Sequence, residues 1–473
     1  MADWDRRTFC IAACAAGAVK HTWADDTGTD FLRELVDVAR RSRAPEDGPL
    51  RLLLPAGSEA NVQPVIDQFS AQTGVQFRVD RVAVDDINTK LLLAAGSGES
   101  IDVALPATYG IPDLVEAGAL TSFDDINLGF DLGTETESLF TLGDYYNNQR
   151  YGLQTDGDVY VMFYNARLLN DPELAAEYQR QFGEPAQPAQ TWGALDRLIR
   201  FYHAPSHSRY GGALFRTPGY LAWEFWIRLH AKGRLPFDDQ MRPQLTSDEG
   251  VVALEELTEV TRYLHPAAST AGLVANWELF AKGETFCCIG WGGSQKYFMS
   301  TMPNDKLDVV VAPTPGGVIA GQPRAFSYFN WGWNYAVPST SSQPELAALF
   351  AYYAASPQMS TQAVREQAGF FDPFHESHYS DTKIAAVYGE EFLSVHRQSM
   401  RDAIPDLYLR GRNQYFEVLD EYLRRVDRRE ITPANALSVV SRLWEVVTDE
   451  LGRAGQVKQW RLLKKRYPGN WFV

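Results

Sequence analysis

Apolar positions after residue 49 alternate between strand spacing and helix spacing. Residues 50–54 are apolar except for Arg51, which is typical of a largely buried strand, and residues 62–69 carry apolar side chains at helical spacing. The alternation continues with a strand predicted over 75–79, a helix over 87–95 and a strand over 101–105. This βαβαβ order predicts parallel strands whose connecting loops lie at one edge of a sheet, where ligands bind.

Two loops of this unit offer candidate ligand contacts. Ser58 is the predicted N-cap of the first helix, so residues 56–59 place a helix N-terminus at the carboxyl end of a strand. Glu59 follows the first strand and Tyr109 follows the third. Because both positions lie at the same predicted edge, both residues are candidates for ligand binding.

The first 24 residues predict an export signal rather than part of the fold. Arg6 and Arg7 precede an apolar run over 9–19 that is shorter than the roughly 20 residues a membrane span needs. This pattern is typical of a twin-arginine signal and predicts a periplasmic protein. Two alternatives stay open: a lipobox that anchors the protein through an acylated Cys14, and an ordinary buried N-terminal helix. Residues 25–48 are predicted as a helical extension that precedes the first strand.

Composition narrows the functional classes. The chain carries 44 Lys and Arg against 60 Asp and Glu, a formal charge of −16, and it lacks the basic stripe that nucleic-acid binding requires. Only Cys287 and Cys288 follow residue 24, and we predict a pair of small buried thiols rather than a strained vicinal disulfide. No cofactor is predicted.

A second group of residues is a weak candidate for metal binding. His375, Glu376 and His378 lie close together in the sequence, with Asp372 and Asp381 nearby. Their spacing matches no metal-binding motif. We therefore predict no metal site and interpret the segment as a solvated loop.

Several segments, in order, resemble one known family. They are INTKLLLAAGSGESIDVALP, YGLQTDGDVYVMFYN, FAKGETFCCIGWGGS and NWGWNYAVPSTSSQPELAALFAYYAASP. Over roughly residues 50–450 the chain is similar to the carbohydrate-binding, maltose-binding-protein-like family of bacterial extracellular solute-binding proteins, the receptors of ABC importers. The chain departs from the family pattern at Trp331-Gly332-Trp333, where a Gly-Gly pair is common, and at Cys287-Cys288, where Met is common.

The resemblance implies a fold and a domain division. The expected fold is α/β, a two-lobed periplasmic-binding-protein fold in which each lobe is a sheet flanked by helices and the ligand cleft lies between the lobes. Residues 49–157 and 309–360 are assigned to the first lobe. Residues 158–308 and 361–473 are assigned to the second lobe. Crossings between lobes are expected near Asp156, Pro313 and Pro357, so that closure about a hinge buries the ligand.

Sugar recognition requires flat aromatic surfaces for C–H faces and a few polar groups for hydroxyls. Trp291 stands between two glycines, which favours a ligand platform, whereas Trp223 lies either in its helix core or at the cleft. Of Trp331 and Trp333, one is expected to pack and one to stack on a ring. The full set of predicted ligand-binding residues is Glu59, Tyr109, Asp156, Asp158, Trp223, Trp291, Gly292, Trp331, Trp333, Phe374 and Arg410, with Arg412 as an equal alternative to Arg410.

The predicted function is a solute-binding receptor that captures a sugar, oligosaccharide or polyol and delivers it to the transmembrane permease subunits of an ABC importer. We expect a monomer. No G-x-S-x-G, H-E-x-x-H, Walker A or dinucleotide-loop motif is present in the sequence. A secreted carbohydrate-active enzyme and a ligand-binding partner of a sensor remain the alternatives, because a glycosidase carboxylate pair forms only in the fold.

Overall fold

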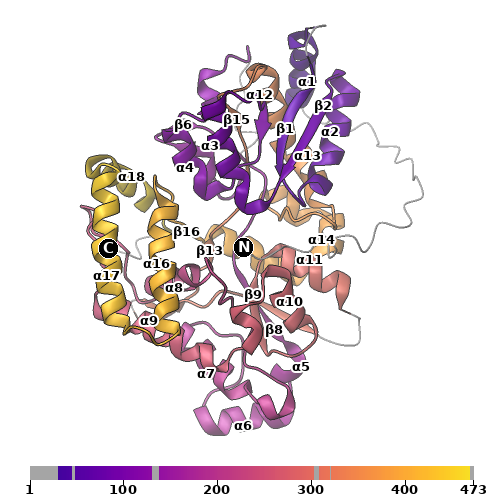
Figure 1. Cartoon of the computed structure of the whole chain (residues 1–473). Coiled ribbons are helices and arrows are strands. Elements are labelled where there is room, and N and C mark those ends of the chain that lie inside the picture. The colour runs from indigo at the N-terminus through magenta and orange to yellow at the C-terminus, as the bar shows by residue number, and fades with distance from the viewer. Residues whose placement is uncertain (1–29, 45–47, 130–137, 303–307, 320, 469–473) are drawn as a thin grey trace.

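The computed structural model describes residues 30–44, 48–129, 138–302, 308–319 and 321–468. These residues form two α/β lobes, one above the other in Figure 1, each with a small sheet flanked by helices. The predicted two-lobed α/β fold is therefore confirmed. Within the described residues no helix combines the length and the apolar character that a membrane crossing demands. The predicted export signal over 1–24 lies outside the described residues.

The sheet of the first lobe follows the predicted βαβαβ order. Strand β1 (Leu50–Pro55) lies between β2 (Phe77–Val82) and β3 (Val103–Ala104), and both neighbours are parallel to it. Helix α2 (Glu59–Thr73) buries the apolar stripe that its sequence spacing predicts, and it ends where Gly74 adopts φ 78°. Within the predicted extension, helix α1 (Asp30–Ser42) packs its apolar face against α2 and α12 (Pro344–Ala355).

The start of α2 differs from the expectation. Ser58 occupies the N-cap position, but its hydroxyl donates backward to the carbonyl of Pro55 at 2.8 Å and caps no helix N–H. The Glu59 carboxylate accepts from the N–H of Gly57 at 2.6 Å instead. The first lobe also contains α3 (Ile87–Ser97), α4 (Ile111–Glu116), α12 (Pro344–Ala355), α13 (Pro357–Val364), β4 (Leu120–Thr121), β5 (Tyr145–Tyr146), β6 (Gln149–Arg150), β7 (Leu153–Gln154), β14 (Asn334–Tyr335) and β15 (Val337–Pro338).

The sheet of the second lobe is antiparallel. Strand β8 (Val161–Asn165) is central, with β9 (Cys287–Gly290) on one side and β10 (Val309–Pro313) on the other. Cys287 and Cys288 are buried free thiols on β9, as the sequence predicts. The helices of this lobe are α5 (Ala166–Leu169), α6 (Pro172–Phe182), α7 (Trp192–Tyr202), α8 (Leu221–Ala231), α9 (Asp248–Val260), α10 (Leu273–Ala281), α11 (Gly292–Thr301), α14 (Thr382–Tyr388) and α15 (Glu390–Arg401).

Two lobe boundaries fall elsewhere than the sequence suggests. Residues 309–313 were assigned to the first lobe, but β10 pairs along its length with β8 of the second. An apolar run such as Val309 to Ala312 reads as a buried strand without specifying which sheet it joins. The other boundary, after residue 360, lies inside α13, and α13 packs against α2 of the first lobe.

A buried group of charges stabilises the second lobe and is named here the second-lobe charge network. Arg228 of α8 donates two hydrogen bonds to Asp196 of α7, at 2.8 and 2.9 Å, and one to Glu224 at 2.9 Å. Arg216 also donates to Glu224, at 2.6 Å. Burial alone would raise the pKa of Glu224, but the two guanidinium groups lower it below its usual value. The two cations and two anions therefore balance.

The C-terminal helices pack against the second lobe and contribute to a group of buried rings, called here the C-terminal aromatic cluster. Helices α16 (Arg412–Asp427), α17 (Pro433–Glu450) and α18 (Arg453–Lys464) stand together at one side of the molecule (Figure 1). Trp444 stacks on Phe237 with ring centroids 4.9 Å apart and donates its indole N–H to the carbonyl of Tyr415 at 2.8 Å. The remaining strands are β11 (Gly317–Ile319), β12 (Gln322–Arg324), β13 (Tyr328–Phe329) and β16 (Ile404–Pro405).

Three segments of chain meet where the lobes join, over residues 155–159, 328–334 and 371–374. Both the N–H and the hydroxyl of Thr155 donate to the carbonyl of Trp333, at 2.9 and 3.0 Å. Val159 pairs with Phe329, which ties the first and second segments together. The N–H of Asp372 donates to Asp156 at 2.6 Å, which ties the third segment to the first. These segments form the lobe junction.

Candidate functional site

Five of the predicted ligand-binding residues form one connected group of rings at the lobe junction. Tyr109 comes from the first lobe, just after β3, and Trp223 comes from α8 of the second lobe. Trp331 lies between them, with ring centroids 5.4 Å from Tyr109 and 5.5 Å from Trp223. Trp291 lies 6.2 Å from Trp223, and Trp333 lies 5.9 Å from Trp331. These five residues are called the junction aromatic set.

Glycines position Trp291 in this set. A Cβ on Gly290 would lie 2.0 Å from the hydroxyl oxygen of Ser294, and one on Gly292 would lie 2.4 Å from a carboxylate oxygen of Asp372. The backbone therefore passes too close to its neighbours for any side chain on either flank. The Trp291 indole N–H donates to Asn330 at 3.0 Å, which fixes the orientation of the ring. Gly292 thus permits the close approach of the backbone to Asp372, and its contact with a ligand stays a prediction.

Two indole N–H groups of the set lack acceptors. The Nε1 atoms of Trp223 and Trp331 are buried and find no hydrogen-bond partner among the described residues. A buried donor without an acceptor costs about 1–3 kcal/mol. A molecule that carries hydroxyl or ether oxygens would satisfy such donors, and the adjoining ring faces would cover its apolar C–H groups. The set can therefore bind a ligand that is polar at its rim and apolar on its faces.

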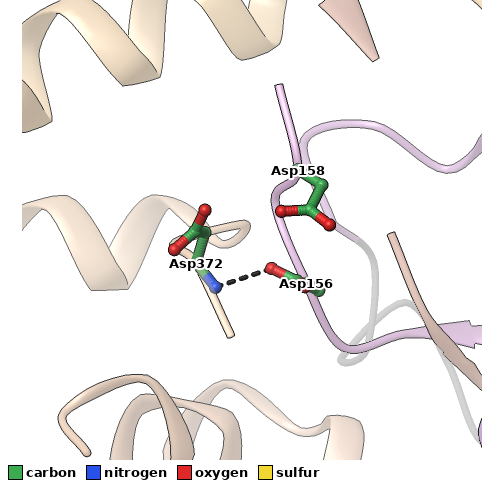
Figure 2. Close-up of side chains that lie close together, drawn as sticks. All are labelled: Asp156, Asp158 and Asp372. Carbon is green, nitrogen blue, oxygen red and sulfur yellow. Dashed lines mark hydrogen bonds between the residues drawn. The ribbon is translucent and has the colours of Figure 1, made fainter. Parts of the chain in front are cut away.

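Three carboxylates lie beside these rings. Oxygens of Asp156, Asp158 and Asp372 all lie within 4.8 Å of one another, and Figure 2 shows Asp156 and Asp158 on one segment facing Asp372 on another. Asp158 accepts from the N–H of Gly332 at 3.3 Å. The carboxylates therefore contact the same segment, 328–334, that carries Trp331 and Trp333. Asp372 accepts from the hydroxyl of Tyr388 at 3.0 Å. These three residues are called the junction carboxylates.

The electrostatics of the junction carboxylates differ from those of surface acids. Burial raises the pKa of Asp156 well above its usual value, and the charges of Asp158 and Asp372 raise it further. Burial and the charge of Asp372 likewise raise the pKa of Asp158 well above its usual value. Burial raises the pKa of Asp372 to about 6, although nearby Lys296 opposes the shift. The pKa of buried Lys296 falls to about 8.

Glu59 and Phe374 lie outside both the junction aromatic set and the junction carboxylates. Glu59 forms an ion pair with Arg81 at 3.1 Å. Phe374 is buried against the rings of His375 and His378, with centroids 4.5 and 4.9 Å away. None of these contacts involves the junction aromatic set.

Arg410 also lies apart, while its neighbour Arg412 reaches the set. The guanidinium of Arg410 lies 3.9 Å from Glu116 on α4. The guanidinium of Arg412 lies 4.5 Å from the ring centre of Tyr109 and is held by Asp406 at 2.8 Å. The two arginines flank Gly411, whose φ of 82° turns the chain between them. Sequence alone gave them equal standing, and no sequence signal separates them.

The histidine segment is not a solvated loop. His375 and His378 are buried, and the Nδ1 of His378 accepts from the N–H of Phe374 at 3.1 Å. The hydroxyl of Ser360 lies 3.1 Å from the Nε2 of His378. Burial lowers the pKa of His378 well below its usual value, so this side chain is a neutral structural element. In the part of the chain that the structure describes, the carboxylates of Asp156, Asp158 and Asp372 are the group whose geometry suits a metal ion.

The fold is that of two-lobed solute-binding proteins. An ABC transporter solute-binding protein from Thermotoga lettingae, bound with α-D-tagatose, aligns over 84% of this chain and 100% of its own, with 20% identity and a TM-score of 0.69. One from Agrobacterium radiobacter, in complex with ribitol, aligns over 85% and 100%, with 17% identity and a TM-score of 0.68. The GacH receptor of Streptomyces glaucescens, described with acarbose, aligns over 89% and 100%, with 18% identity and a TM-score of 0.68.

Residues 65–386 match the bacterial extracellular solute-binding protein family, and the chain belongs to that family. The resemblance seen in the sequence is thereby confirmed. The family and the structural relatives are binding proteins. No curated protein matches the chain.

Proposed function

We propose that this solute-binding receptor captures a sugar or polyol between the rings of the junction aromatic set and delivers it to the transmembrane subunits of an ABC importer. The observation that carries the proposal is the contribution of both lobes: Tyr109 from the first, Trp223 and Trp291 from the second, and Trp331 in contact with both sides. A ligand bound between these rings would contact both lobes at once. Binding would therefore favour the closed arrangement of the lobes about the hinge.

The ligands of the structural relatives support the proposed solute class. α-D-Tagatose, ribitol and acarbose are the bound molecules of the three proteins compared above. Each carries hydroxyl groups, which the unpaired indole N–H groups of Trp223 and Trp331 would satisfy. Of the sequence-predicted ligand residues, we retain Tyr109, Trp223, Trp291, Trp331 and Trp333 as ring contacts and propose Arg412 in place of Arg410. Periplasmic release after residue 24 and anchoring through Cys14 are both consistent with delivery to a permease.

A two-stage experiment tests this function. The mature protein is first screened by thermal unfolding against monosaccharides, oligosaccharides and polyols, since a ligand at 100 times its dissociation constant adds about 2.7 kcal/mol of stability. The best ligand is then titrated into Trp291→Ala, for which we expect a loss of roughly tenfold or more in affinity from lost stacking and apolar burial. Incubation of the ligand with the protein and analysis for products tests turnover, which would favour the enzyme alternative.

Trp444→Ala is the matched control. Trp444 is fully buried in the C-terminal aromatic cluster, so its removal should cost about 3–5 kcal/mol of stability and leave the affinity of the folded fraction unchanged. If Trp291→Ala behaved like this control, with a destabilised fold and unchanged affinity, Trp291 would be a core residue and the proposed site would be wrong.

A further inference from the structure

The junction carboxylates concentrate negative charge where the fold leaves little to balance it. Asp156 and Asp372 are almost completely buried, with 0% exposure each, and Asp158 is half-buried. Among the described residues the buried cation beside them is Lys296, so the ionised carboxylates would place three negative charges against one positive charge. Buried charges are ordinarily paired, because their removal from water is costly. The junction therefore has an excess of negative charge that its own side chains do not offset.

Lys296 is committed to other partners. Its ammonium group donates to the backbone carbonyls of Glu366, Gly369 and Phe371 at 3.1, 3.0 and 2.9 Å. An ammonium group has three protons, so these bonds use all of its donors. Lys296 thus contributes its charge to the junction at a distance, while its hydrogen bonds hold the 366–371 segment in place.

A second observation is the state of Asp156. One carboxylate oxygen, Oδ1, accepts from the N–H of Asp372 at 2.6 Å. The other, Oδ2, is fully buried and has no hydrogen-bond partner among the described residues. Oxygens of Asp158 and Asp372 lie within 4.8 Å of an oxygen of this same carboxylate. A completely buried carboxylate oxygen without a donor, next to two further carboxylates, is the arrangement that a cation would satisfy.

We propose that Asp156, Asp158 and Asp372 bind a hard metal cation, most suitably Ca²⁺, at the lobe junction. The donor set is all oxygen, which selects hard cations over the softer metals that prefer thiolate or imidazole. Oxygens this close approach the spacing that bonds of about 2.3–2.6 Å to one Ca²⁺ require. Mg²⁺ needs shorter bonds and near-ideal octahedral geometry, which a site on two separate segments supplies less readily.

The position of this site gives it a structural task. Asp156 and Asp158 belong to the first crossing segment and Asp372 belongs to the third, so one ion would join two segments at the hinge (Figure 2). The assignment changes the sequence-based role of Asp156 and Asp158 from hydroxyl acceptors to metal ligands. It stands apart from the proposed sugar site, because the ion contacts carboxylates rather than the junction aromatic set.

Terbium luminescence tests the proposal on the mature protein after treatment with chelator and dialysis. Tb³⁺ takes the same oxygen ligands as Ca²⁺, and Trp291, next to Gly292 and in close reach of Asp372, can sensitise it. We expect Tb³⁺ emission excited through tryptophan, its displacement by Ca²⁺, and a rise in the midpoint of thermal unfolding with added CaCl₂. Asp156→Asn and Asp158→Asn should each weaken ion binding by roughly tenfold or more, because affinity follows the number of charged ligands.

Asp67→Asn is the control, since Asp67 is an exposed acid on α2 and belongs to none of the three junction segments. It should bind Tb³⁺ as the wild type does. Unfolding in chelator shows whether each Asn variant is folded, and loss of repulsion should leave Asp158→Asn at least as stable as the wild type. Equal ion binding by all variants would assign it to the general acidic surface and overturn the site. The absence of any response to Tb³⁺ or Ca²⁺ would overturn the site as well. So would a result in which the carboxylates bind no metal ion but bind a cationic amino sugar, with binding lost in Asp156→Asn.

Discussion

Two of the buried charge groups in the described residues differ in how their charge is compensated. In the second-lobe charge network, Arg216 and Arg228 meet Glu224 and Asp196 through hydrogen bonds of 2.6–3.3 Å, and the formal charges cancel. Among the junction carboxylates, three acids face each other and the nearby lysine bonds elsewhere. Most members of both groups are buried, so the contrast concerns how the charge is compensated.

The difference follows from where each group is placed. Arg228, Glu224 and Asp196 belong to helices α7 and α8 of a single lobe. The junction carboxylates come from two crossing segments, so their spacing depends on how those segments meet. Full pairing offsets the cost of burying charge, and buried carboxylates without such pairing are candidates for a functional site.

The largest expected effect comes from breaking the balanced group. Arg228→Leu leaves Glu224 without one of its partners and Asp196 without its guanidinium, so we expect a loss of about 3–5 kcal/mol in the free energy of unfolding. Denaturant titration measures the loss. The control is Arg234→Leu, because Arg234 pairs with Glu249 at the exposed surface and should contribute less than about 1 kcal/mol. Similar losses in both variants would remove the distinction between paired burial and surface pairing.

A smaller effect should separate the two groups by pH. The pKa of Asp372 is raised to about 6 in the fold, so its contribution to stability is present below its usual pKa of 3.8 and is lost as the pH rises through 6. In chelator, the stability of the wild type should therefore fall relative to Asp372→Asn by at most about 3 kcal/mol between pH 4 and pH 7. The pKa of Glu224 is lowered in the fold, so its contribution to the stability of the protein is lost only at acidic pH. Parallel pH profiles for wild type and Asp372→Asn would contradict this reading.

The smallest effect concerns an exposed pair that belongs to neither group. Glu59 is about one-third exposed and bonds to Arg81 and to the N–H of Gly57. Glu59→Gln should change the free energy of unfolding by less than about 1 kcal/mol and leave sugar affinity unchanged. Isothermal titration with the best ligand from the screen measures the affinity, and Arg81→Gln serves as the companion variant. A tenfold loss of affinity in Glu59→Gln alone would place Glu59 at the solute site.

The spacing of apolar residues predicted many helices and strands of this fold, because each of these elements depends mainly on residues that are neighbours in the sequence. The strand over 50–54 and the helix that ends at Gly74 follow from spacing and turn residues. The sheet that β10 joins could not be predicted, since an apolar strand fits any buried edge. Sequence did not separate Arg412 from Arg410 and grouped Asp372 with the histidines, because the neighbours of both residues are brought to them by other segments.

Gly157 lies between Asp156 and Asp158 and has no room for a side chain. A Cβ there would lie 2.0 Å from the carbonyl oxygen of Pro373, and the Nε2–H of His396 donates to the Gly157 carbonyl at 2.9 Å. In a receptor that closes on its solute, a methyl group at this point would act as a wedge between two crossing segments and lower the population of the binding-competent arrangement. Apparent affinity falls in proportion to that population. A residue that touches no solute would thus set the concentration range in which the receptor responds.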